Sequence, residues 1–210
     1  LRSRGVTVPI LILGASGEEA VEDLINFDIT PSVFTYEFAK ALSYEAERKE
    51  KVTKIHIKID TGMSRIGFLA GENNEEIVDE IIKISKLPYI EIEGIFSHFA
   101  TSDEYDKSYT LLQYGRFMDV CSRLEEKGLN IPIKHICNSA GIMMYPEMHL
   151  DMVRPGVILY GMYPSDEVDK SRLDLIPAMT LKSTITHIKE VEPGRGVSYG
   201  KEYITDKKTK

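Results

Sequence analysis

Apolar and polar positions along the chain follow two periods, one typical of strands and one typical of helices. Residues 54–59 alternate one by one, as a half-buried strand does, whereas residues 36–48 repeat their apolar positions at helical spacing. We expect strands at residues 9–14, 29–34, 54–59, 89–99, 131–137 and 157–160. We expect helices at residues 18–26, 36–48, 75–86 and 106–127, and a short apolar helix after Asn138.

The strict alternation of predicted strands and helices indicates parallel βα units, and therefore an α/β fold. Two architectures fit this order, a doubly wound sheet and a (β/α)8 TIM-type barrel. No Gly-x-Gly-x-x-Gly motif follows the first strand and no Walker phosphate loop is present. These absences disfavour a dinucleotide or nucleoside triphosphate site.

The pattern of the sequence changes after residue 165. Charged residues follow Pro164 and Ser165, and from Met179 to Val191 apolar and polar residues alternate as in a strand, until Pro193-Gly194 interrupts them. We expect a partial, cofactor-binding barrel at residues 1–165, a linker at 166–176 and the start of a β-rich domain at 177–210.

Composition restricts the possible partners. The 210 residues carry a net charge of −7, which argues against nucleic-acid binding, and the longest apolar run, 8–13, is too short to cross a membrane. Cys121 and Cys137 lack metal-ligand spacing and are expected to be buried thiols in a reducing cytoplasm. His56, His135, His149 and His187 are not spaced as a metal site, and we expect them to be structural.

Polar or turn residues follow several predicted strands, where the active sites of parallel α/β proteins lie. They are Lys58, His98, Asn138-Ser139 and Arg154-Pro155-Gly156. A guanidinium stays protonated and suits an anionic or heteroaromatic ligand, and a glycine lets backbone amides approach a phosphate. Singly, each has a structural interpretation: His98 as a core histidine, Asn138 as a helix cap, Arg154-Pro155-Gly156 as a strand-entry turn.

Five segments of the chain together resemble one known family, the bacterial alanine racemases. They are Lys58-Ile59-Asp60-Thr61-Gly62-Met63-Ser64-Arg65-Ile66-Gly67-Phe68, Ser97-His98-Phe99-Ala100, Asn138-Ser139-Ala140, Arg154-Pro155-Gly156 with Tyr160-Gly161, and Val197-Ser198-Tyr199-Gly200. Each segment alone has little specificity, but their order matches the family, and the resemblance covers nearly the whole chain.

The resemblance implies a pyridoxal 5'-phosphate enzyme built as a (β/α)8 barrel followed by a β domain. Arg154 would face the pyridine nitrogen, and Arg65 would lie near the phenolic oxygen of the cofactor and the carboxylate of the substrate. Lys58 would be carbamylated and orient Arg65. The remaining cofactor contacts would be Asn138, Ser139 and the backbone amides of Gly156 and Val157, with the last three holding the phosphate.

The resemblance further implies racemisation by two bases, the lysine that carries the cofactor and Tyr199 from the other subunit of a head-to-tail homodimer. A phenol with an unperturbed pKa near ~10 needs help to act as a base, which a chain from Tyr199 through His98 to Arg154 would supply. The implied function is interconversion of L-alanine and D-alanine in the bacterial cytoplasm, which supplies D-alanine for peptidoglycan.

One element of the family has no match in the chain, the first-strand segment that contains the cofactor lysine. The opening 1–5 instead resembles the family sequence just before its third strand. We therefore expect a fragment with about six βα units, an incomplete barrel that is inactive alone even with added cofactor. A serine or broad-specificity racemase and a non-catalytic cofactor-binding protein remain alternative functions.

Overall fold

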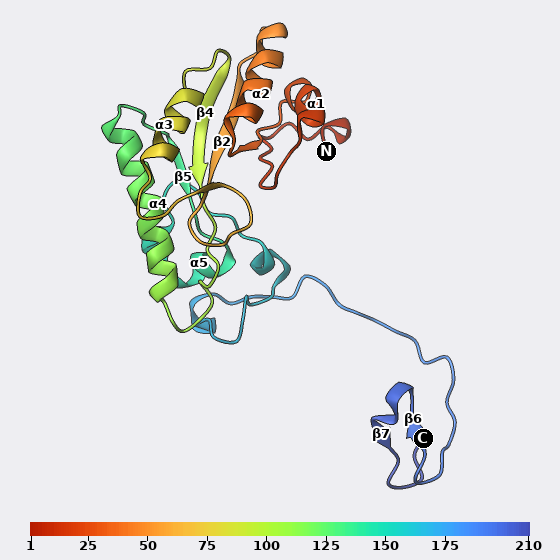
Figure 1. Cartoon of the computed structure of the whole chain (residues 1–210). Helices are drawn as coiled ribbons and strands as arrows, with labels where there is room; N and C mark the ends of the chain where they lie inside the picture. Colours follow the sequence, from red (N-terminus) through yellow and green to blue (C-terminus); the bar gives the residue numbers. More distant parts are fainter. The chain divides into compact units, whose positions relative to one another are not determined.

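The computed structural model describes residues 1–210, which divide into two compact units, Leu1–Ala178 and Met179–Lys210. The strands of the first unit are β1 (Ser32–Val33), β2 (Thr53–Asp60), β3 (Phe68–Leu69), β4 (Ile90–Phe96) and β5 (Ile133–His135) (Figure 1). Its α-helices are α1 (Val21–Asn26), α2 (Tyr36–Arg48), α3 (Glu75–Ile84), α4 (Ser108–Glu126) and α5 (Ser139–Met144). Its 3-10 helices are η1 (Arg2–Arg4), η2 (Glu18–Ala20), η3 (Pro146–Met148), η4 (Val157–Tyr160) and η5 (Lys170–Arg172). The second unit contains β6 (Gly196–Val197), η6 (Tyr199–Lys201) and β7 (Tyr203–Ile204).

The sheet of the first unit is parallel, and its strand order follows the chain. The order is β1-β2-β4-β5, and the two residues of β3 pair beside the end of β2. A doubly wound sheet reverses its strand order at a switch point, whereas a barrel wall adds each strand beside the preceding one. The predicted α/β class with a parallel sheet is confirmed, and the strand order is that of a barrel wall.

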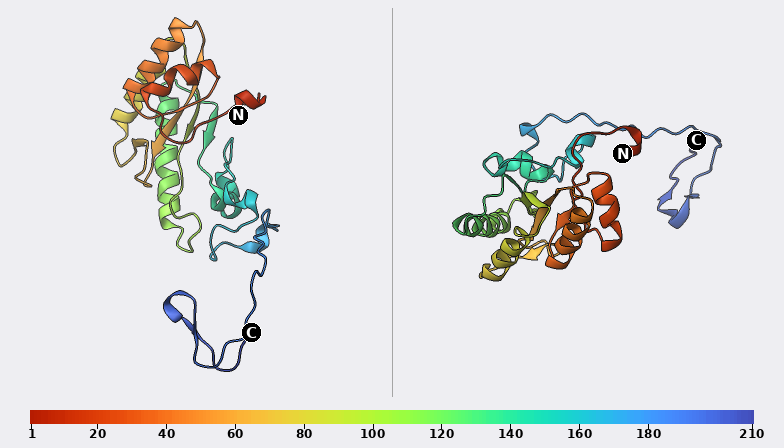
Figure 2. Two further views of the ribbon diagram at one scale, coloured as in Figure 1. Left: turned by 90° about the vertical axis from the view of Figure 1, so that its right-hand side faces the viewer. Right: turned by 90° about the horizontal axis from the view of Figure 1, so that it is seen from above.

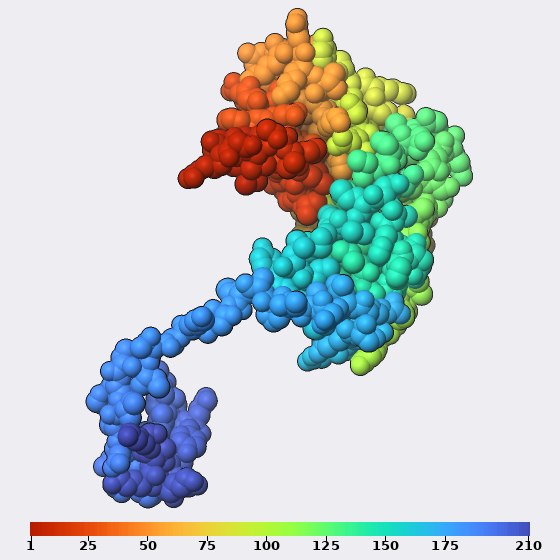
Figure 3. Space-filling model, turned by 180° about the vertical axis from the view of Figure 1, so that it is seen from behind, coloured from red at the N-terminus to blue at the C-terminus, as the bar shows by residue number.

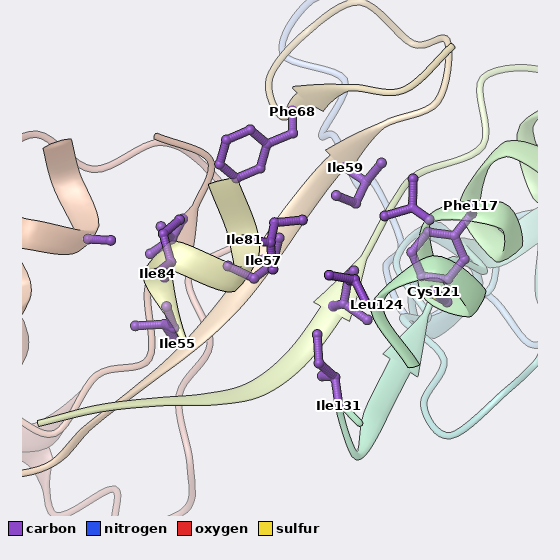
Figure 4. Packing of buried hydrophobic residues seen from close by; sticks show 14 of the residues in the cluster. Ile55, Ile57, Ile59, Phe68, Ile81, Ile84, Phe117, Cys121, Leu124 and Ile131 are labelled. Carbon is purple, nitrogen blue, oxygen red and sulfur yellow. The ribbon is translucent and has the colours of Figure 1, made fainter. Parts of the chain in front are cut away.

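Strand β2 is buried on both faces, and its two faces have different chemistry. Ile55, Ile57 and Ile59 are fully buried and pack in the core with Ile81 and Ile84 of α3 and with Phe117 and Leu124 of α4 (Figure 4). Because successive side chains of a strand point to opposite faces, His56, Lys58 and Asp60 point away from these helices. The helix-facing side is therefore an apolar core, while the other side carries titratable groups.

Helices α1 to α4 lie along one face of the sheet, as the view from above shows (Figure 2). Helix α2 has the predicted bounds, because Thr35 begins it as an N-cap whose hydroxyl accepts a hydrogen bond from the backbone N–H of Phe38 at 3.3 Å. No helix of the structure combines the length and apolarity that crossing a membrane requires.

The strand predicted at 157–160 is wrong, because these residues form the 3-10 helix η4. Local bonds, from Leu159 N to the Gly156 carbonyl and from Gly161 N to the Ile158 carbonyl, satisfy this backbone without a neighbouring strand. Gly161 ends the helix in the left-handed region at φ 74°. The apolar side chains that suggested a buried strand are largely outside the core; Leu159, for example, is 67% exposed.

Two other predicted strands are reduced to single bridges. Residues 9–14 pair only through Leu11 with Thr30, and the alternating residues 179–191 pair only through Val191 with Thr209. Alternation alone does not form a strand, because the backbone also needs a hydrogen-bonding neighbour. In the segment 179–191, coloured blue in Figure 3, the side chains of Met179 and Leu181 are 81% and 95% exposed.

Part of the segment predicted as a linker is packed. Val168 is buried and lies in a small cluster with Ala140 and Met143. In the second unit, β6 and β7 form an antiparallel pair, and the buried Thr205 hydroxyl donates to the Glu192 carbonyl at 2.8 Å. The predicted division at 166–176 stays a prediction.

Strand β2 ends in a tight loop held by one carboxylate. Oδ1 of Asp60 accepts hydrogen bonds from the backbone N–H groups of Gly62, Met63 and Ser64 at 2.9, 3.0 and 3.0 Å. Gly62 adopts its positive φ without strain, but Ser64 has φ 57°, which is costly for a residue with a Cβ, and the carboxylate compensates this cost. The same loop carries Arg65 into the region beside Lys58.

Asp60→Ala should destabilise the first unit by about 3 kcal/mol, because three backbone donors lose a charged acceptor. Asp60→Asn is the matched control, since its amide oxygen still accepts, and it should cost roughly half as much. Urea unfolding of the 210-residue chain measures both. Equal losses for the two variants would show that the acceptor does not hold the loop.

Candidate functional site

Titratable side chains from three neighbouring strands meet on the sheet face opposite the helices. His56 and Lys58 come from β2, His135 from β5, and His98 from just after β4. Phe96 lies among them, with its ring stacked on that of His135 at a centroid distance of 4.7 Å. This arrangement follows from the parallel sheet, because equivalent positions on adjacent strands point to the same side.

Arg154 is the centre of this group of side chains. Its Nη1 lies 2.5 Å from Nδ1 of His135, and its Nη2 lies 3.3 Å from Nδ1 of His98. Nη2 also donates to the carbonyl oxygens of Ser97 at 2.7 Å and Ile136 at 3.1 Å. None of these partners is a carboxylate, and Nε of Arg154 is buried without any hydrogen-bond partner.

The arginine determines the protonation of both histidines. A guanidinium only donates hydrogen bonds, so Nδ1 of His98 and Nδ1 of His135 must be unprotonated acceptors. Burial, reinforced by the charge of Arg154, lowers the pKa of His98 to about 4 and that of His135 to about 2. Burial also lowers the pKa of Arg154 to about 10, which leaves it charged at neutral pH. The guanidinium of Arg154 is therefore a cation between two neutral imidazoles.

Lys58 adds a second buried nitrogen to the site. Its Nζ donates to the carbonyl of Ile59 at 2.8 Å and lies 5.2 Å from the centre of the Phe96 ring. Burial lowers the pKa of Lys58 to about 8, so this amine is mostly charged at neutral pH but has a larger neutral fraction than an ordinary lysine. Arg65 is exposed, but it lies near enough for its charge to contribute to the lowered pKa values of Lys58 and His98.

A second cluster follows β5 and contains most of the predicted phosphate contacts. Asn138 caps α5, accepting at its side-chain oxygen from Gly141 N and from the Ser102 hydroxyl, both at 2.9 Å. Gly156 N donates to the hydroxyl of Ser139 at 2.9 Å. A Cβ on Gly156 would meet only that hydroxyl, at 3.7 Å, so the space beside this backbone is open.

The structure thus brings together two groups of predicted site residues in the first unit. Lys58, His98 and Arg154 form the polar group, while Ser139 and Gly156 are hydrogen-bonded to each other. Val157 begins the 3-10 helix η4 that follows Gly156. Tyr199 belongs to the second unit, where its side chain is 99% exposed.

Three residues that were not predicted belong to the surroundings of the site, two by direct contact with a predicted residue and one through His135. His135 touches Arg154, His56 touches His135, and Gln113 of α4 donates to the carbonyl of His98 at 3.0 Å. The spacing of His56 and Lys58, two residues apart on one strand, was the available signal that both share a face. His149, in contrast, bonds only to the Ile142 carbonyl, as expected of a structural histidine.

The buried histidines should make stability depend on pH. Their folded pKa values lie below the unfolded value, so their contribution is complete above about pH 6.5 and is lost as pH falls. For His135 the loss at pH 5 should be about 2 kcal/mol. Urea unfolding of the 210-residue chain between pH 7.5 and 5 measures it. His135→Asn should flatten the profile, and an equally steep profile in that variant would contradict the assignment.

Comparison with known proteins agrees with this geometry. The family model described as alanine racemase, N-terminal domain, matches residues 1–164, and that described as alanine racemase, C-terminal domain, matches residues 178–210. An alanine racemase of Clostridium tetani is 52% identical over the whole chain, which spans 53% of that protein.

Solved structures show the same relationship. An alanine racemase of Clostridium difficile matches 99% of the chain with 50% identity and a TM-score of 0.89, and the chain covers 53% of it. An alanine racemase of Bacillus anthracis with bound L-Ala-P matches 98% of the chain with 33% identity and a TM-score of 0.83, again with 53% of that structure covered. The chain spans about half the length of these relatives, and it belongs to the alanine racemase family.

Proposed function

We propose that the protein containing this chain interconverts L-alanine and D-alanine with pyridoxal 5'-phosphate and so supplies D-alanine for peptidoglycan. The observation that carries the proposal is the unpartnered Nε of Arg154, a buried donor on a guanidinium whose two Nη atoms contact neutral histidines. A buried unpaired donor is costly, and an aromatic nitrogen acceptor would satisfy it. Family membership supports the reaction type.

The residues of the site fit this cofactor. Arg154 would donate to the ring nitrogen, and Ser139 with the backbone amides of Gly156 and Val157 would hold the phosphate. Bound pyridoxal phosphate withdraws electrons from the α-carbon of an amino acid, which makes its proton removable. Asn138, which already orders the start of α5, would border the cofactor. The surplus of positive charge from Lys58, Arg65 and Arg154 suits an anionic cofactor and a substrate carboxylate.

Arg154 would orient the cofactor without exchanging a proton with it. Its guanidinium remains charged at neutral pH even with the pKa lowered to about 10, so it donates a hydrogen bond but keeps the proton. A ring nitrogen facing this donor stays unprotonated. The arrangement favours removal and return of the α-proton over reactions that need stronger electron withdrawal.

His98 would connect Arg154 to the second base. Because Nδ1 of His98 accepts from Arg154, the neutral ring carries its proton on Nε2. An Nε2–H that donates to the phenol oxygen of Tyr199 would stabilise the phenolate and so favour its action as a base. We assign this tyrosine to the partner subunit of a head-to-tail homodimer in the bacterial cytoplasm.

Lys58 has the properties required for carbamylation. A neutral amine attacks the carbon of carbon dioxide, loses a proton to water and leaves an anionic carbamate. The pKa of about 8 supplies the neutral amine, and Arg65 would pair with the product and be oriented toward the substrate carboxylate.

With the rest of the racemase, we further propose that the parallel sheet closes into a (β/α)8 barrel and that residues 177–210 begin the β-rich domain.

The first test replaces Arg154 in the full-length protein. Arg154→Glu should lower kcat for D-alanine formation by about 100-fold or more, since a charged hydrogen bond worth about 3 kcal/mol is lost and the opposite charge is introduced. It should also change the absorbance spectrum of the bound cofactor. Arg154→Lys keeps the charge and should lose less. An unchanged spectrum in Arg154→Glu would contradict the proposed contact, and cofactor binding without any turnover in the unmodified protein would favour the non-catalytic alternative.

The second test replaces the proposed tyrosine base. Tyr199→Phe should slow exchange of the α-hydrogen with deuterated water from one enantiomer by about 100-fold or more, because general-base catalysis contributes that much. Exchange from the other enantiomer, which depends on the lysine, should change little. Nuclear magnetic resonance of both enantiomers measures the rates. Equal slowing of the two exchanges would refute the assignment of separate bases.

A further inference from the structure

A line of side chains leads from Arg154 through two buried histidines to a carboxylate. Nδ1 of His135 lies 2.5 Å from Nη1 of Arg154, and Nε2 of His135 lies 2.8 Å from Nδ1 of His56. Nε2 of His56 lies 3.4 Å from Oε2 of Glu93. Arg154 comes from the segment between η3 and η4, His135 from β5, His56 from β2 and Glu93 from β4. Because β4 lies between β2 and β5, the contact between the two histidines spans β4.

The hydrogens of this line can point in only one direction. Arg154 donates to Nδ1 of His135, so the single proton of that neutral ring is on Nε2. Nε2–H of His135 then donates to Nδ1 of His56, and the proton of His56 is likewise on Nε2, where it faces Glu93. Each histidine uses one nitrogen as acceptor and the other as donor, and the line runs from cation to anion.

The surrounding residues are shaped to hold the two rings. Gly94 is next to Glu93. A Cβ on Gly94 would lie 2.4 Å from the His56 ring, so no larger residue fits beside the ring in its present position. The register of β2 and β4 shifts between Ile55 and His56, beside this glycine. Phe96 stacks on His135 with an interplanar angle of 2°. These features restrict both rings to one orientation.

Burial, together with the charges around the line, keeps both histidines neutral at neutral pH. Burial is the main cause of the lowered pKa of His56 and of His135. Arg154 adds to both effects, as does Lys54 for His56 and Lys58 for His135, while Glu93 acts in the opposite direction on His56. Lys54 also donates to Oε1 of Glu93 at 2.6 Å, which holds that carboxylate in place.

We propose that His135, His56 and Glu93 are positioning residues, which fix the Arg154 guanidinium through a proton-ordered chain of hydrogen bonds ending at the carboxylate. Without them Nη1 of Arg154 would lack its acceptor, and the guanidinium could rotate away from the ring nitrogen of the cofactor. The inference rests on the proposed function only for the part that concerns the cofactor. The chain of hydrogen bonds itself is a property of these 210 residues.

The first experiment needs neither cofactor nor substitution. Nitrogen-15 chemical shifts of the histidine rings in the 210-residue chain distinguish bare from protonated nitrogens. His56 and His135 should both carry their proton on Nε2 and remain neutral from pH 8 to 7, with the exposed His187 as a solvent-contacting reference. A proton on Nδ1 of either ring, or a charged ring in this range, would overturn the proposal.

The second experiment measures the arginine directly, with a matched pair of variants. The amide oxygen of asparagine can replace Nδ1 of histidine as an acceptor, whereas phenylalanine offers none. Separate signals from the Nη–H groups of Arg154 show hindered rotation. They should persist in His135→Asn and merge in His135→Phe. If the phenylalanine variant does not fold, Glu93→Leu and Glu93→Gln supply the comparison at the carboxylate end of the line. Glu93→Leu should broaden the Nη–H signals of Arg154, and Glu93→Gln should not. Identical signals within both pairs would contradict the positioning role.

The third experiment uses the cofactor-loaded full-length protein. His135→Phe should lower kcat by about 10- to 100-fold and change the cofactor spectrum, whereas His135→Asn should restore most of both. If the ring nitrogens show the ordered hydrogen bonds but His135→Phe leaves the cofactor spectrum unchanged, the positioning role is overturned. A complete lack of racemisation in the unmodified protein, with these hydrogen bonds intact, would refute the proposed function. The inference that the hydrogen bonds fix the Arg154 guanidinium would still hold.

Discussion

The site depends on one constraint, that a guanidinium can donate hydrogen bonds but cannot accept them. Arg154 lies between His98 and His135, and its contacts make both rings neutral acceptors on Nδ1. Both carbonyl oxygens that it binds, those of Ser97 and Ile136, belong to segments at the ends of strands β4 and β5. One side chain therefore joins the backbone of two strands to the protonation of two imidazoles, and its remaining buried donor is available to a ligand.

The alternating faces of β2 allow this site to exist beside a stable core. Ile55, Ile57 and Ile59 supply apolar burial against the helices, while His56 and Lys58 occupy the opposite face at no cost to that core. Burial on the polar face is what lowers the pKa of Lys58 to about 8 and keeps the histidines neutral. The fold thus creates the unusual ionisation of the site by burying its polar groups, an effect that outweighs the opposing charges of Glu93 on His56 and of Asp60 on Lys58.

Periodicity predicted the helices better than the strands. Residues 36–48 form the expected helix, because a helix is satisfied by bonds within its own segment. Residues 157–160 have an apolar pattern suited to a strand, but they form local 3-10 bonds, since a strand requires a partner that the pattern cannot reveal. For the same reason, the spacing of residues could not predict the contact between His56 and His135, which are 79 residues apart in the sequence. The family motifs contain His98 and Arg154, whose side chains lie 3.3 Å apart in the structure, whereas His135, which also contacts Arg154, carries no motif.

The central claim is that Arg154 keeps its proton and holds the ring nitrogen of the cofactor in the unprotonated state. The most direct measurement is the nitrogen-15 chemical shift of pyridoxal 5'-phosphate labelled at the ring nitrogen and bound to the full-length protein at neutral pH. The account predicts a bare nitrogen that accepts a hydrogen bond, and a shift toward the protonated value in Arg154→Glu. A protonated ring nitrogen in the unmodified protein would contradict it.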